Sequence, residues 1–204
     1  MCFTACVRRL ALLVGGSAGN EQLTAIVATL LTVLLVVEGA TLLDVQSLLT
    51  VHAFVGVLLV PVVAVKLAST GWRALRYYLG ADEYVRRGPP HVALRVLVAP
   101  VLVASTACLL GTGLALLALD PTEGQLVGLH KASFVVWLGA TAVHVLTRLA
   151  PLAHGLGRRL PGTAARVAVA GAALAAGVAV ATLTLPAADR LQDRLSSHVG
   201  FDDR

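Results

Sequence analysis

Five long apolar blocks, separated by short polar stretches, constrain the fold of this chain more than any other feature. We place them at residues 23–43, 47–69, 91–119, 124–149 and 167–185. Each is close to the roughly 20 residues that an α-helix needs to cross about 30 Å of hydrocarbon. Only 13% of the 204 residues are charged, whereas soluble domains carry about 25%. The sequence therefore predicts an all-α integral membrane bundle of about five transmembrane helices.

The positive charges indicate membrane orientation rather than nucleic-acid binding, although the net charge is +5. Arginines gather before the first block, after the second and after the fourth, while the turns at 44–46 and 120–123 carry acidic residues and no Lys or Arg. Since cytoplasmic loops are the basic ones, we expect a cytoplasmic N-terminus and a C-terminus outside. The stretch 71–78 joins arginines with Trp and Tyr, which is typical of headgroup depth.

The blocks also divide the chain into segments. We expect residues 1–20 to be an uncleaved cytoplasmic or interfacial segment, and residues 21–150 to form a four-helix bundle. Residues 151–186 would hold a loop and the fifth transmembrane helix, and residues 187–204 a polar tail. The fifth block is rich in Ala and Val, and small residues let helices approach closely. It is therefore predicted to be a peripheral helix or a contact between copies of the chain.

Histidines inside the apolar blocks are the main functional signal, because ionisable groups at membrane depth are costly. His130 and His144 lie fourteen residues apart on one block, and His52 and Lys66 repeat that spacing on another. Fourteen residues come within about 40° of four whole helical turns and span about 21 Å. Each pair therefore shares one helix face, with one member near each leaflet.

The direction of the helices sets which residues share a depth. The second and fourth blocks run parallel, so His52 and His130 are predicted in the outer leaflet and Lys66 and His144 in the inner leaflet. Two neutral imidazoles on facing helices can ligate a haem iron axially. We predict an outer bis-histidine haem b held by His52 and His130. The alternative is a pair of polar side chains that only hydrogen-bond between helices.

This arrangement resembles the four-helix membrane cytochromes b, namely the b561-type proteins and the cytochrome b subunits of respiratory oxidoreductases. The resemblance covers about residues 23–149 and implies two b haems, one per leaflet, and electron transfer to or from a quinone. The strings VHAFVGV at 51–57, KLASTGWR at 66–73 and LHKASF at 129–134 are also similar to a group of uncharacterised small bacterial membrane proteins. The resemblance thus implies a location in the bacterial inner membrane.

Lys66 departs from the family pattern, which has histidine at that place. Lysine ligates iron only as the neutral amine, so Lys66 and His144 are candidate ligands for an uncertain second haem. Otherwise Lys66 extends to the interface, and His144 binds a quinone, relays protons or hydrogen-bonds in the bundle. We interpret Glu38 as an interface residue, with orientation of His52 as the alternative.

The predicted function is electron transport by a b-type haem membrane protein, at most the electron-transfer subunit of an oxidoreductase. No nucleotide-binding glycine motif or CxxC pair is present in the sequence, so a quinone or a docked redox protein would be the partner. One alternative is a transporter or proton-conducting protein that uses Lys66 and His144. The other is a structural subunit without a cofactor.

Overall fold

The chain is described here from a computed structural model, which covers residues 16–86, 88, 94–121, 123–157 and 160–202. Most of the predicted N-terminal segment, and with it Arg8 and Arg9, lies outside these residues. The described residues form helices and turns and no strand, which confirms the all-α prediction.

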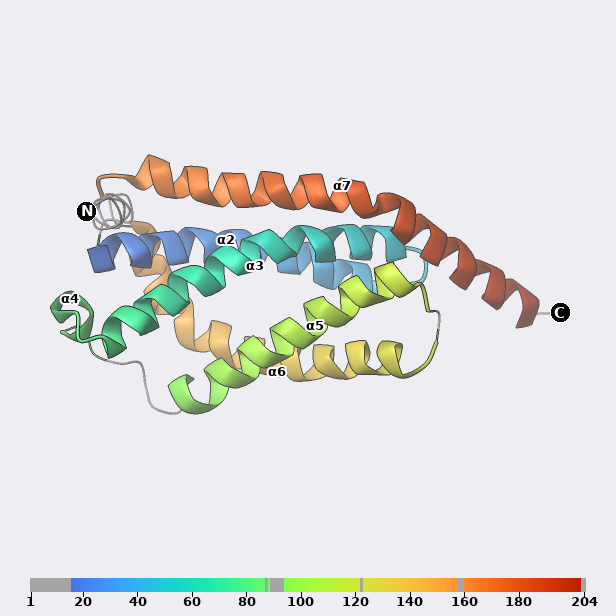
Figure 1. The fold of residues 1–204 in the computed structure, drawn as a ribbon, viewed down its shortest axis with the longest axis horizontal. Coiled ribbons are helices and arrows are strands. Elements are labelled where there is room, and N and C mark those ends of the chain that lie inside the picture. The colour runs from blue at the N-terminus through green and yellow to red at the C-terminus, as the bar shows by residue number, and fades with distance from the viewer. Residues whose placement is uncertain (1–15, 87, 89–93, 122, 158–159, 203–204) are drawn as a thin grey trace, which may run out of the picture.

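Five long helices dominate the described part of the chain, and Figure 1 shows their arrangement. The elements in chain order are α2 (Gly16–Thr41), η1 (Leu42–Asp44), α3 (Leu49–Tyr78), α4 (Asp82–Val85), η2 (Leu94–Val98), α5 (Ala99–Leu119), α6 (Gln125–Gly157) and α7 (Thr163–Asp202). Helices α2, α3, α5, α6 and α7 are each long and apolar enough to cross a membrane. The protein is therefore a multi-pass membrane protein, as predicted.

Several helices run beyond the apolar blocks that predicted them. Helix α2 begins at Gly16 and α3 continues to Tyr78, through the arginine and aromatic stretch. Helix α7 continues through Pro186 to Asp202, across residues that we expected as a polar tail. Hydropathy locates the boundary of the hydrocarbon layer, whereas a helix ends only where its backbone hydrogen-bond pattern is interrupted.

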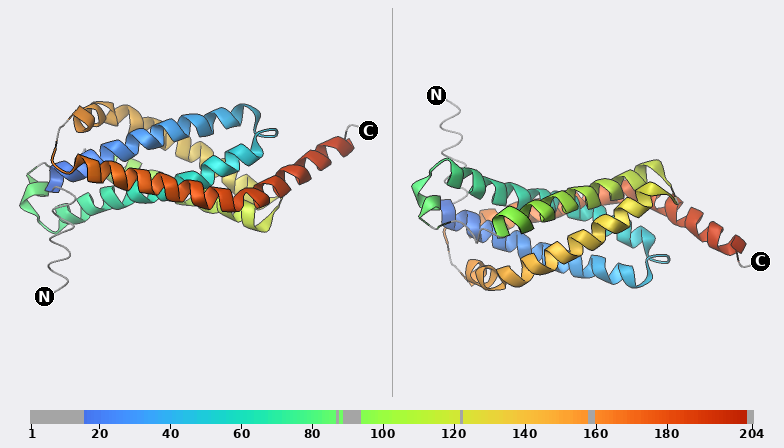
Figure 2. Two further views of the ribbon diagram at one scale, coloured as in Figure 1. Left: turned by 90° about the horizontal axis from the view of Figure 1, so that it is seen from above. Right: turned by 90° about the horizontal axis from the view of Figure 1, so that it is seen from below.

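Four of the helices form a bundle with a defined order of neighbours. Helix α2 packs beside α3 and α6, and α5 packs beside the same two helices. Helices α3 and α6 therefore stand at opposite corners of the bundle (Figures 1 and 2). We call the end with the start of α2 and the finish of α3 the basic end, and the opposite end the histidine end.

Helix α7 lies outside the four-helix bundle, along α3 and α2 (Figure 1). Its buried face is built from small residues, including Ala170, Ala173 and Ala181, which pack against α2 and α3. A Cβ on Gly177 would collide with the carbonyl oxygen of Leu58, so the two backbones are in close contact there. The buried small residues of α7 are thus used within the chain, and α7 is peripheral to the four-helix bundle as predicted. Contact between copies of the chain through this helix stays a prediction.

Candidate functional site: a pair of histidines across the bundle

His52 and His130 meet in the interior of the bundle, near its histidine end. They project from α3 and α6, the helices at opposite corners, and their ring centroids are 6.4 Å apart. The two ring planes are nearly perpendicular, at 87°. The structure therefore brings together the two residues that the helix directions placed at one depth.

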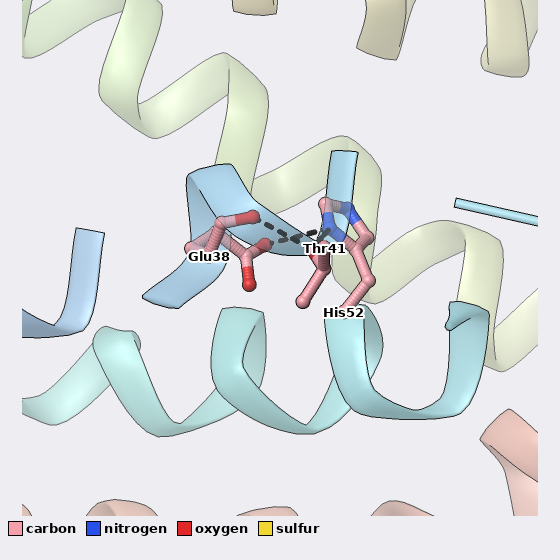
Figure 3. A network of polar contacts seen from close by, with 3 residues as sticks. All are labelled: Glu38, Thr41 and His52. Carbon is pink, nitrogen blue, oxygen red and sulfur yellow. Dashed lines mark hydrogen bonds and ion pairs between the residues drawn. The ribbon is translucent and has the colours of Figure 1, made fainter. Parts of the chain in front are cut away.

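The Nδ1 atom of His52 is held by two residues from the end of α2 (Figure 3). Glu38 Oε1 lies 2.9 Å from it and Thr41 Oγ1 lies 3.0 Å from it. The Thr41 hydroxyl donates its one proton to the Glu38 carbonyl at 2.6 Å, so it can only accept from the ring. Because a carboxylate also accepts, the neutral form of His52 carries its proton on Nδ1 and presents a bare Nε2.

His130 is held in a matching way by the neighbouring helix α5. Thr112 Oγ1 lies 3.0 Å from His130 Nδ1 and donates its own proton to the carbonyl of Cys108 at 2.7 Å. His130 is thereby also the Nδ1–H tautomer, with the lone pair on Nε2. Gly113 gives this ring room, since a Cβ there would lie 3.3 Å from His130 Cε1.

The separation of the two rings is compatible with one metal between them. Imidazole nitrogen binds first-row metals at about 2.0–2.1 Å, and the ring centroid lies about 1.1 Å further, so two opposed ligands have centroids about 6.3 Å apart. The observed separation of 6.4 Å agrees with this value. Hydrogen bonds to the second ring nitrogen, such as those of Glu38, Thr41 and Thr112, are the usual support of metal-bound histidines.

A cavity of about 990 Å³ lies between the four helices and extends past both histidines. At the histidine end it is lined by Glu38, and at the other end by Arg73 and Tyr78. Glu38 Oε2 and Thr141 Oγ1 are buried on its wall with no hydrogen-bond partner among the described residues. Unsatisfied buried polar atoms are rare in proteins, so a ligand or an ordered water in the cavity is expected to pair with these two.

Lys66 and His144, the candidate ligands for a second haem, line the same cavity nearer the basic end. The Nζ atom of Lys66 donates to the Thr24 carbonyl of α2 at 3.0 Å. Both side chains are half-buried, so Lys66 extends within the bundle. Among the described residues, no group of three or more His, Cys, Asp and Glu side chains could hold a metal ion.

Helix α7 forms hydrogen bonds with the N-terminal end of α3, the helix that carries His52. Gln192 Oε1 accepts from the Thr50 backbone N–H at 2.9 Å, and its Nε2 donates to the Ser47 carbonyl at 2.9 Å. Leu48, at the N-cap position of α3, makes no side-chain hydrogen bond to the helix end. Gln192 of α7 supplies that hydrogen bond instead. Leu191 and Leu195 of the same segment line the cavity.

Some of these residues were not identified from the sequence. Thr41 and Thr112 carried no sequence signal beyond a hydroxyl in an apolar helix. Glu38 was preferred as an interface residue, and its contact with His52 agrees with the alternative given for it. His91, and the side chains of His154 and His198, lie outside the part of the chain that the structure describes.

No protein-family model matches the chain, and no match was found among the curated proteins or the solved structures. What the site can do is therefore argued from the geometry of its own residues.

Proposed function

We propose that the chain is a b-type haem membrane protein that carries electrons, with His52 and His130 as the axial ligands of one haem. The observation that supports this most is the pair of imidazoles 6.4 Å apart, each with Nδ1 held by an acceptor. Both Nε2 lone pairs remain for a metal. Two opposed ligands suit an iron whose other four ligands come from a porphyrin.

Bound haem would supply one-electron redox chemistry, and the residues of the chain would hold and tune it. His52 and His130 bind the iron, while Thr41 and Thr112 keep both rings in the ligating tautomer. Glu38 places a carboxylate on the ring of His52, which makes that imidazole more basic and favours the oxidised iron. The surrounding apolar helices exclude water, which also tunes the redox potential.

The redox partner would be a quinone in the membrane or a protein docked at one end of the bundle. In the orientation that the arginines favour, the basic end faces the cytoplasm of a bacterial cell and the histidine end faces outside. The chain would then act as the electron-transfer subunit of an oxidoreductase.

The test is a reduced-minus-oxidised visible spectrum of the protein purified in detergent after expression with ample haem supply. A sharp reduced α-band is expected from the natural chain and from His144→Ala, the matched control on the same helix. His52→Ala and His130→Ala should each abolish it. Haem analysis as the pyridine haemochrome should give one haem per chain.

Other results would change the assignment in defined ways. Two haems per chain, with half lost in His144→Ala, would assign a second haem to Lys66 and His144. A colourless natural protein, or an α-band that survives both His52→Ala and His130→Ala, would refute the proposal.

A further inference from the structure

The half of the cavity at the basic end has a different chemistry from the half at the histidine pair. Its wall carries three cationic side chains, those of Lys66, Arg73 and Arg95, and one acidic side chain, that of Glu21. About 21 Å of helix separates Lys66 from His52, at 1.5 Å per residue. The residues around the histidine pair are therefore distant from the basic end of the cavity.

One of the cationic groups, that of Arg95, lies beside a pair of tyrosines that line the cavity. The guanidinium of Arg95 lies 5.8 Å from the centroid of the Tyr78 ring. Tyr77 packs edge-on against Tyr78, with ring centroids 5.4 Å apart. Arg73 and Tyr78 line the cavity and are also exposed, so the cavity opens to the surface at this end.

Beyond this mouth the wall becomes apolar. It is formed by side chains of several helices, among them Leu31, Leu59, Val63, Leu102 and Val103. The hydroxyl of Thr141, buried without a hydrogen-bond partner among the described residues, lies on the same wall. This half thus offers positive charge, an apolar interior, and hydroxyl groups that include that of Thr141.

We propose that the basic half of the cavity binds one anionic phospholipid. Its phosphate would lie near Arg73 and Arg95 at the open end, with Lys66 further along the same wall, and its acyl chains would occupy the apolar interior. The excess of positive charge selects an anionic over a zwitterionic headgroup, because each Lys or Arg near such a surface contributes about 1 kcal/mol of attraction. Lipid binding here would require neither the histidine pair nor haem.

The experiment compares two arginines one turn apart on α3. Arg73 lines the cavity, whereas Arg76 is exposed, does not line it, and lies 5.8 Å from the Trp72 ring centroid. The natural chain, Arg73→Gln, Arg95→Gln and Arg76→Gln are reconstituted in nanodiscs of equal phosphatidylglycerol and phosphatidylcholine. Each is then released into mild detergent, and native mass spectrometry counts the lipids retained.

The natural chain and Arg76→Gln should retain one phosphatidylglycerol with about a tenfold preference over phosphatidylcholine. Arg73→Gln and Arg95→Gln should bring the two lipids close to parity, with unchanged elution in size-exclusion chromatography as the folding control. A parallel sample contains inorganic phosphate. If the site binds any soluble anion, phosphate should remove the preference for phosphatidylglycerol; if the site binds a lipid, the preference should remain.

Three outcomes would overturn the lipid site. These are equal retention of both lipids by the natural chain, an equal loss in Arg76→Gln, and loss of the preference with inorganic phosphate. A fourth is the mass of a second haem per chain in place of the lipid. None of these results depends on an α-band, so failure of the lipid site and failure of the haem proposal are distinguishable.

Discussion

Replacing Thr112 by Val tests the idea that a hydroxyl on α5 sets the tautomer of His130. Thr112 is buried, and Val keeps its shape but removes the acceptor 3.0 Å from His130 Nδ1. The ring of His130 then keeps only its hydrogen bond with the Leu109 backbone, and a typical hydrogen bond contributes about 0.5–1.5 kcal/mol. Loss of a supporting partner of a metal ligand costs about 10- to 100-fold in affinity, which is about 1.4–2.8 kcal/mol. Haem affinity of Thr112→Val should therefore fall by this factor of about 10 to 100.

Thr106→Val is the matched control for this substitution. Thr106 is on the same helix, lines the same cavity, and donates to a backbone carbonyl, that of Leu102, at 2.6 Å. The control therefore loses the same kind of hydrogen bond within α5 but no contact with a histidine. Haem release is followed by transfer to an excess of an apo haem-binding protein. Release from Thr112→Val that is no faster than from Thr106→Val would refute the role of Thr112.

Three further predictions concern packing and tuning. Gly177→Ala should destabilise the protein by about 1–3 kcal/mol through overpacking against α3. Gly171 has open space around it, so Gly171→Ala should stabilise the protein by up to about 1 kcal/mol. Thermal unfolding in detergent compares the two variants. Glu38→Gln should raise the haem midpoint potential by on the order of 60 mV, a tenfold change in the redox equilibrium, and a potentiometric titration that shows no rise would exclude its tuning role. Gln192→Ala should cost about 1 kcal/mol, as loss of a helix cap does, and hydrogen exchange at the Thr50 amide should accelerate; unchanged exchange would contradict that capping role.

The pairing of His52 and His130 could be predicted because it depends only on counting. The number of spans between two helices sets their relative direction, and the place of a residue within each span sets its depth. Which helices then stand at opposite corners depends on packing. Thr41 and Thr112 reach the rings through that packing, so their hydroxyls were indistinguishable from others in apolar helices.

The course of α7 was predicted in part. Its apolar block indicated a transmembrane helix, but the polar residues after Pro186 carried no hydropathy signal. Gln192 and Asp189 bind the start of α3, and these contacts join segments about 140 residues apart in the chain. Such long-range pairs leave no periodic pattern in a single sequence, which is why a solvated tail was expected there.

Electron paramagnetic resonance of the oxidised, purified protein tests the central claim most directly, because the signal of ferric haem reports both the number and the orientation of its axial ligands. Two imidazoles with ring planes at 87° should give a low-spin ferric signal of unusually large anisotropy. The same sample of His130→Ala should lose it. A high-spin signal from the natural chain, or no ferric haem signal, would contradict axial ligation by His52 and His130.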